Sequence, residues 1–446
     1  MTASRWILAI TLGGVVIVAA AGLWYLTSPG PLTFAGAGTV RLADYKGSKP
    51  TGVPAELAQS DPLSRGRYLA DAADCQACHT REGGVPFAGG RAFQTQFGTL
   101  YSSNITPDRE TGIGAWTPAD FLRAVHKGVR PGGAHLYPAF PYAAYTYLTD
   151  DDVQAIWTYL RSVAAVRNPV PANDLAFPFN QRWLMGIWSA LFNPDRRFTP
   201  NGRRSAEWNR GAYLAEALAH CGECHTPRTP LQSLDNRRKF AGALTAGWRA
   251  YNITAHPTTG VGDWNDVGLA QYLATGHAAN HGTASGPMGE AIGLSLSKLT
   301  PGDVQALVTY LRSVPSIASP DLPAVRTAVA DTAPGSGLEA NADSPGKQVF
   351  AGACSGCHGW SGASPLMERA TLTGSRAIND PTAVNVVQTV LNGSSGGSST
   401  TPAMPAFGAD YSDAEIAAVA NYMTARFGAR ASAVTPRTVA QLRTTM

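Results

Sequence analysis

The amino-acid sequence predicts a mainly α-helical chain of three tandem units that follow one N-terminal apolar helix. A helical opening led by glycine occurs three times and runs each time into a Cys-x-x-Cys-His motif; the openings begin at Gly66, Gly211 and Gly346. Each unit then closes with an amphipathic segment behind a helix N-cap residue: 148–163 with Thr149, 299–314 with Thr300, and 411–428 with Ser412. Glycine and proline gather in the loops between these segments, where few strands are indicated.

The repeat sets the predicted boundaries along the chain. With 446 residues, of which 44% are apolar, the chain is long enough for more than one core. We expect an N-terminal signal-anchor helix (1–30), a first unit (60–165), a connector with an amphipathic helix (166–204), a second unit (205–315), a linker rich in proline and alanine (316–342), a third unit (343–430) and a C-terminal tail (431–446).

The N-terminus carries an uncharged run from Trp6 to Leu26 that is preceded by Arg5. Twenty-one residues in a helix are enough to cross a hydrocarbon core ~30 Å thick. A cleaved signal peptide is the alternative, because the chain starts with positive charge and has small residues suited to cleavage at 19–21. The run is longer than a signal core and ends in aromatic residues, which favours an uncleaved anchor. Both alternatives export the body of the chain.

The connector contains one apolar stripe at helical spacing, within residues 177–194. The stripe consists of Trp183, Leu184, Ile187, Trp188, Leu191 and Phe192. Such a stripe usually packs against neighbouring domains. The alternative is an interfacial helix that lies on a membrane near a quinone pocket.

All six cysteines occur in the three Cys-x-x-Cys-His motifs: Cys75, Cys78 and His79; Cys221, Cys224 and His225; Cys354, Cys357 and His358. The two sulfurs of a motif lie one helical turn apart, so both can add to the vinyl groups of one porphyrin. The histidine that follows is placed to coordinate the iron. A zinc ribbon would need two converging cysteine pairs, whereas these pairs lie far apart in sequence. The motifs therefore predict three covalent haems c in cytochrome-c-like domains.

The sixth iron ligand is predicted from what each unit offers downstream of its motif. Met288 and Met404 lie in glycine- and proline-rich loops and are the expected distal ligands of the second and third haems. Met423 lies in a closing helix and is assigned to the core. The first unit has no methionine between its motif and its closing helix, so His135 is the leading candidate, with His126 or an open site as alternatives.

Charge and composition exclude some functions. The chain has 35 basic and 31 acidic residues, with the basic ones in short scattered groups, so nucleic acid is not an expected partner. No flavin, pterin or quinone-cofactor signature is visible, and we predict no catalytic residue for substrate oxidation on this chain.

At this point the sequence resembles a known family, the triple-haem cytochrome c subunits of bacterial membrane-bound dehydrogenases. The resemblance covers about 60–445 and is carried by CQACHT, FGTLYSSNITPDRETGIGAWTPADF, LYPAFPYAAYTYLTDDD, FPFNQRWLMGIWSALF, HCGECHTPR, CSGCH and AMPAFGADYSDAEIAAVANYM. It implies periplasmic haem attachment on the inner membrane, electrons arriving from a large catalytic dehydrogenase subunit, and ubiquinone as the acceptor. It supports Met288 and Met404 as ligands.

One position departs from the alcohol-dehydrogenase type of this family, in which methionine stands where this chain has Phe140. Phenylalanine cannot ligate iron, so the first haem is expected to differ and to have a lower potential. This departure and the N-terminal anchor favour a molybdenum-type aldehyde dehydrogenase partner, with a small iron–sulfur subunit as a further candidate. The alternatives are the cytochrome subunit of a PQQ-type alcohol dehydrogenase, a free membrane-tethered carrier, and a haem enzyme acting at an open first haem.

Overall fold

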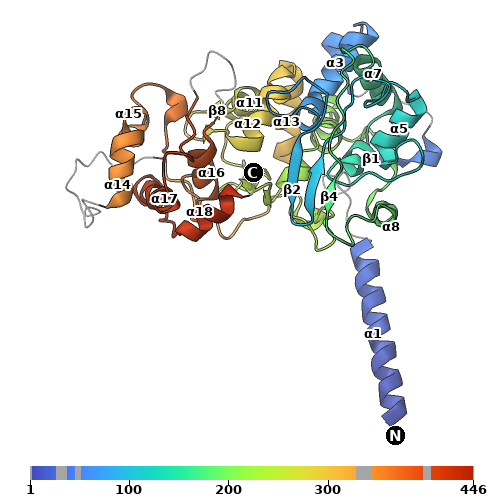
Figure 1. The fold of residues 1–446 in the computed structure, drawn as a ribbon, viewed down its shortest axis with the longest axis horizontal. Helices are drawn as coiled ribbons and strands as arrows, with labels where there is room; N and C mark the ends of the chain where they lie inside the picture. Colours follow the sequence, from blue (N-terminus) through green and yellow to red (C-terminus); the bar gives the residue numbers. More distant parts are fainter. Residues whose placement is uncertain (1–2, 27–37, 46–51, 328–343, 395–402, 445–446) are drawn as a thin grey trace.

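The computed structural model describes residues 3–26, 38–45, 52–327, 344–394 and 403–444. The body is mainly helical, as predicted, and the helix α1 (Ala3–Leu26) stands away from it (Figure 1). Among the described residues, no helix combines the length and the apolar character required to cross a membrane. The membrane anchor at residues 1–30 therefore stays a prediction.

The first unit contains α3 (Pro62–Ala72), α4 (Cys75–Cys78), α5 (Pro118–Lys127), α6 (Tyr142–Tyr145) and α7 (Asp150–Leu160). The second contains α9 (Ala206–Tyr213), η3 (Leu214–Leu218), α10 (Gly222–His225), α11 (Asp266–Thr275), α12 (Gly286–Leu294) and α13 (Pro301–Ser313). The third contains α14 (Pro345–Val349), η7 (Phe350–Cys354), α15 (Ser355–His358), α16 (Val384–Asn392), α17 (Asp413–Phe427) and α18 (Pro436–Arg443).

The strands are short and antiparallel. β2 (Ala92–Thr95) and β3 (Gly98–Tyr101) form a hairpin that β4 (Asp174–Leu175) extends, and β1 (Gly38–Arg41) pairs with β5 (Arg196–Thr199). The second unit has the pairs β6 (Ala243–Thr245) with β7 (Trp248–Ala250) and β8 (His277–Ala278) with β9 (Gly282–Thr283). None of these strands is long enough to form a sheet core, so the helices determine the architecture.

The predicted N-caps are confirmed. The side chains of Thr149, Thr300 and Ser412 each accept a hydrogen bond from the backbone N–H three residues later, at the starts of α7, α13 and α17. Ser412 also forms a full capping box with Glu415. These caps stop the closing helices from extending backward into the preceding loops.

The opening and closing helices of each unit cross at a glycine. A Cβ atom on Gly66, Gly211 or Gly346 would lie 2.0, 1.9 or 2.2 Å from a backbone carbonyl oxygen of the closing helix, at Ala155, Ala306 or Ala418 respectively. Only a residue without a side chain allows this approach. The three helix crossings therefore share one geometry, which explains why each opening begins with glycine.

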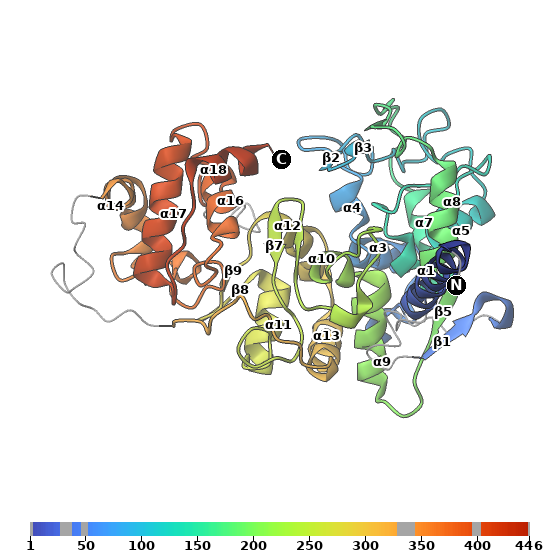
Figure 2. The same ribbon diagram turned by 90° about the horizontal axis from the view of Figure 1, so that it is seen from below.

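The first two units share one hydrophobic core, whereas the third has its own. One cluster of buried side chains extends from Tyr68 to Val314, and another from Phe350 to Val439. Figure 2 shows the third unit, in orange and red, at one end of the molecule, with the second unit between it and the first. The predicted boundaries at 165 and 205 therefore divide the sequence but not the core.

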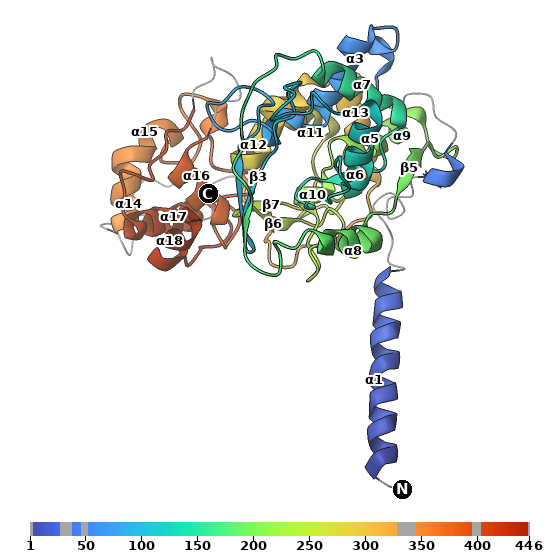
Figure 3. The ribbon, with the colours of Figure 1, turned by 45° about the vertical axis from the view of Figure 1, so that its right-hand side comes forward.

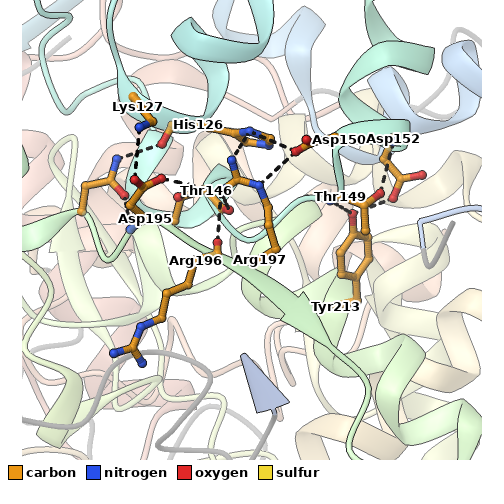
Figure 4. Close-up of polar contacts among 11 residues, drawn as sticks. His126, Lys127, Thr146, Thr149, Asp150, Asp152, Asp195, Arg196, Arg197 and Tyr213 are labelled. Carbon is orange, nitrogen blue, oxygen red and sulfur yellow. Dashed lines mark hydrogen bonds and ion pairs between the residues drawn. The ribbon is translucent and has the colours of Figure 1, made fainter. Parts of the chain in front are cut away.

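The contact between the first two units is reciprocal. The Tyr213 hydroxyl of α9 donates to Asp152 Oδ2 of α7 over 2.6 Å and accepts the Thr149 N–H over 3.0 Å (Figure 4). At the equivalent positions, the Tyr68 hydroxyl of α3 donates to Asp303 of α13 and accepts the Thr300 N–H. Each unit thus inserts the tyrosine of its opening helix into the cap of the other unit's closing helix.

Candidate haem sites

The three Cys-x-x-Cys-His motifs lie on or beside short helices: α4, α10, and η7 with α15. In each motif the histidine Nδ1–H donates to a backbone carbonyl oxygen: His79 to Ser103 over 2.7 Å, His225 to Tyr251 over 2.5 Å, and His358 to Ala370 over 2.5 Å. A carbonyl oxygen can only accept, so the bond fixes the tautomer and leaves the Nε2 lone pair to coordinate a metal. Burial lowers the pKa of each imidazole, which keeps it neutral.

None of the six cysteines is paired in a disulfide. Burial raises the pKa of Cys78 and Cys221 to about 12 and that of Cys354 to about 11, so the side chains are neutral thiols rather than thiolates. In the first motif both cysteines lie in the single helical turn α4 (Cys75–Cys78). This donor set fits a porphyrin attached through two thioethers and held by an imidazole.

The first two motifs open into one cavity of about 2840 Å³, which Cys75, Cys78, His79, Cys221, Cys224, His225 and Met288 help to line. This volume exceeds the ~300–1,000 Å³ of an ordinary small-molecule pocket and suits two large planar groups. The third motif faces a small apolar cavity, lined by Cys354, His358, Met404 and Met423 among others. The structure thus brings Met288 and Met404 to the cavities of their own units, and it brings the core residue Met423 there as well.

Residues 63–164 match the cytochrome c family, and residues 341–423 match the family described as cytochrome c oxidase, cbb3-type, subunit III. The fructose dehydrogenase cytochrome subunit of Gluconobacter japonicus is 39% identical over 89% of this chain and 85% of that protein. The chain belongs to the family of dehydrogenase cytochrome c subunits. It follows that its cytochrome domains bind haem c covalently and transfer electrons.

Two other members of the family differ in how much of their own length this chain matches. A nicotinate dehydrogenase subunit of Pseudomonas putida is 40% identical over 82% of this chain, which spans only 30% of that protein's length. A diheme cytochrome c-type protein of Cereibacter sphaeroides is 35% identical over 68% of this chain and 96% of its own length. A family member named for two haems thus matches about two thirds of this chain.

Polar contacts that the sequence did not reveal connect the first and second units beside the shared cavity. The Arg91 guanidinium donates to Glu290 of α12 over 2.5 and 2.9 Å and to the Ala77 carbonyl oxygen of α4 over 2.5 Å. Between the motifs, the Tyr145 hydroxyl donates to the Ala73 carbonyl oxygen over 2.7 Å, and its ring packs edge-on against His220 at 5.3 Å. The sequence places each of these residues in one of the first two units but does not indicate the contacts between them.

An acidic group also faces the cavity next to the first motif. Asp74 has a left-handed backbone (φ 54°), and burial, reinforced by Glu290, raises its pKa to about 8. Its Oδ1 is buried and without a hydrogen-bond partner among the described residues. A buried neutral carboxyl at this point is compatible with nearby anionic groups, such as haem propionates.

The histidines proposed for the first haem occupy different places. His126 is buried, and its Nδ1 accepts a hydrogen bond from Arg197 over 2.6 Å beside Asp150 (Figure 4). Burial and Arg197 hold its pKa well below the ordinary value, and its Nε2 is buried without a hydrogen-bond partner among the described residues, so its role as a ligand also stays a prediction. His135 lies in the loop that leads to Phe140, and its Nδ1 is buried without a partner among the described residues. The His135 ring lies against Gly186 rather than in the cavity wall, and its role as a ligand stays a prediction.

Proposed function

We propose that this chain carries three haems c and passes electrons from the catalytic subunit of a dehydrogenase to ubiquinone in the inner membrane. The observation that carries the proposal is the threefold repetition of one ligand arrangement. Each motif has two unpaired cysteines and a histidine whose Nδ1–H is bonded to a backbone carbonyl. Haem c supplies one-electron chemistry, because its iron changes between the ferric and ferrous states.

The residues of this chain have separate tasks in the proposal. The cysteine pairs attach the three porphyrins, and His79, His225 and His358 are the proximal ligands. Met288 and Met404 are the distal ligands of the second and third haems, and His135 is that of the first. A thioether ligand raises the potential relative to a nitrogen ligand, so the first haem has the lowest potential of the three.

Haem content tests the number of sites directly. A pyridine haemochrome assay on the purified full-length chain, matured in a periplasm, is expected to give three haems per chain. The variant C354S/C357S is the matched test of the third motif, which lies outside the shared core, and it should lose one haem. A wild-type value of two, unchanged in the variant, would refute attachment at the third motif.

We propose a molybdenum-type dehydrogenase as the partner, with an aldehyde as the substrate class and a small iron–sulfur subunit as a further component. Phe140 supports this choice, since it removes the methionine that the alcohol-dehydrogenase type has there. A cytochrome subunit of a PQQ-type alcohol dehydrogenase is the alternative. Purification of the native complex, followed by metal analysis of the large subunit, separates the two. A chain that purifies alone would instead indicate a free carrier.

The acceptor and the location are tested in the same preparation. Inverted and right-side-out membrane vesicles should show the haems on the periplasmic side, and α1 should resist extraction by alkaline carbonate. With substrate present, the purified complex should reduce a water-soluble ubiquinone analogue at a rate that depends on the haems. Reduced haems that fail to reoxidise with the analogue would refute ubiquinone as the acceptor and leave the dehydrogenase partner intact.

A further inference from the structure

The second and third units meet along β7 and α16, which Figures 2 and 3 show side by side. The Asn385 side chain of α16 pairs with the backbone of Arg249 in both directions. Its Oδ1 accepts the Arg249 N–H over 2.8 Å, and its Nδ2 donates to the Arg249 carbonyl oxygen over 2.9 Å. One turn further along the helix, Gln388 Nε2 donates to the Gly247 carbonyl oxygen over 3.1 Å. Two side chains of the third unit therefore hold the backbone of a hairpin that belongs to the second.

Asp380, in the loop before α16, lies at the centre of the same interface. Its side chain is fully buried, at 0% exposure. Its Oδ1 accepts a hydrogen bond from Arg249 Nη1 over 3.2 Å, and its Oδ2 accepts one from the Tyr251 hydroxyl over 3.2 Å. Within its own unit, Asp380 also accepts the N–H and the hydroxyl of Thr382. One buried carboxyl group of the third unit thus anchors two side chains of the second.

The anchored segment carries the carbonyl group that orients the histidine of the second motif. The His225 Nδ1–H donates to the Tyr251 carbonyl oxygen over 2.5 Å. Such a bond fixes the plane of the ring, and it makes the other ring nitrogen a stronger donor to a metal. The position of this carbonyl depends on the Tyr251 side chain, which is bonded to Asp380, and on Arg249 two residues earlier. The third unit is therefore placed to adjust the ligand strength of His225.

The first unit provides an internal comparison. Ser103 occupies the place of Tyr251, because each directly precedes an Asn-Ile-Thr sequence, at Asn104 and Asn252 respectively. The carbonyl of each accepts the Nδ1–H of its motif histidine. Ser103 is exposed, and its side chain has no hydrogen bond to any other described residue. The repeated unit thus supplies the carbonyl acceptor by itself, and the further link to another unit is an addition in the second.

A second point of the interface works in the opposite direction. His358 donates to the carbonyl oxygen of Ala370, which ends the short helix η8 (Glu368–Ala370) of the third unit. The carbonyl oxygen of the preceding residue, Arg369, accepts the hydroxyl of Thr283 over 2.8 Å. Thr283 lies in β9 and belongs to the second unit. Each of the two units therefore holds the segment that carries the histidine acceptor of the other.

We propose that the second and third units set each other's haem potentials through this interface, with Asp380 as a positioning residue for His225 and Thr283 as one for His358. The inference rests on the proposed function in one respect, namely that both motifs bind a haem. A hydrogen bond that makes an imidazole more basic stabilises ferric iron. Loss of either anchor therefore raises the potential of the haem in the other unit.

Redox titration of the full-length, haem-loaded chain tests this crossed dependence. Asp380→Asn should shift the equilibrium of the second haem toward the ferrous form on the order of tenfold, which is ~59 mV for a one-electron couple. Tyr251→Phe keeps the contact between Arg249 and Asp380, and it should shift the same haem in the same direction by less. Thr283→Val should raise the potential of the third haem. Asp321→Asn is the matched control, because Asp321 also binds Arg249 but its side chain is 56% exposed, and all potentials should stay in place.

Reference variants identify the components of the titration. The variant C354S/C357S lacks the third haem, and Met288→His lowers the potential of the second, because nitrogen replaces a thioether. Unchanged potentials in Asp380→Asn, together with a lower midpoint of thermal unfolding, would overturn the proposal and leave the interface a purely structural role. A shift of the third haem alone in Asp380→Asn would also overturn it, since the effect would not cross the interface. A pyridine haemochrome count of three in every single-site variant separates both failures from a failure of the proposed function.

Discussion

The two reciprocal tyrosine–aspartate contacts differ in the other partners of their aspartates, and the effect of this difference on stability can be measured. In both, a buried tyrosine hydroxyl donates to an aspartate at the start of a closing helix. Asp303 is also bound by Arg210, whose Nε donates over 2.7 Å. Among the described residues, Asp152 forms no ion pair of this kind, and its Oδ1 has no hydrogen-bond partner. We therefore predict that Tyr213→Phe destabilises the first two units more than Tyr68→Phe does.

The magnitudes follow from what each substitution leaves behind. Tyr213→Phe removes a bond to a buried carboxyl group and costs ~2–3 kcal/mol. Tyr68→Phe leaves Asp303 paired with Arg210, and the cost is ~1 kcal/mol. For a cooperative unit of about 250 residues these values lower the midpoint of thermal unfolding by roughly 5–10 °C and 2–4 °C. Scanning calorimetry of the haem-loaded chain measures both, and equal losses, or a larger loss for Tyr68→Phe, would refute the reasoning.

The same pair predicts a pH dependence. Burial raises the pKa of Asp152, and the Tyr213 hydroxyl opposes that shift. The folded carboxyl thus keeps its proton at pH values where the unfolded one has lost it, so its contribution to stability falls as the pH rises above ~4. Tyr213→Phe raises this pKa further. The difference in unfolding free energy between wild type and variant should therefore widen as pH rises through the folded pKa of Asp152.

Three other outcomes are expected. Met404→Leu should lower the midpoint potential of one haem by on the order of 0.1 V in a redox titration, whereas Met423→Leu should leave all potentials in place. His135→Gln should convert the first haem to high spin in the optical and EPR spectra; a spectrum that stays low-spin would exclude His135. Gly346→Ala should destabilise the third unit by about 1–3 kcal/mol in thermal unfolding, because its Cβ would meet the closing helix, and Gly352→Ala, which meets nothing within 4 Å, should not.

Local chemistry predicted much of the fold. The caps at Thr149, Thr300 and Ser412 were recognisable because a cap needs only a short side chain and an N–H three residues later. The histidines expected to ligate iron were recognisable because haem attachment requires adjacent positions in the sequence. Neither inference depends on how distant segments meet.

The remaining features depend on contacts between distant segments, which no local pattern encodes. Arg91 and Glu290 are 199 residues apart, and nothing near either residue indicates the other. The contact between His126 and Arg197, which are 71 residues apart, was likewise not indicated by any local pattern. The apolar stripe on α8 (Trp183–Phe192) was expected to pack against neighbouring domains or to lie on a membrane, whereas in the structure most of it lines the large cavity next to the first two motifs. Periodicity reveals where apolar residues lie on a helix, but not what covers them.

The exchange of tyrosines between the first two units has a consequence for how such a chain could have arisen. An interface in which residue i of one copy meets residue j of the other, and j meets i, is the isologous contact of a twofold-symmetric dimer. Tyr68 with Asp303 and Tyr213 with Asp152 have this form within a single chain. A one-haem ancestor that paired through its opening helix would need only gene duplication and a connector to give the present arrangement. On this view the bond from Arg210 to Asp303 marks where the two halves have since diverged, because the Nε of Arg65, at the equivalent place before Gly66, has no hydrogen-bond partner among the described residues.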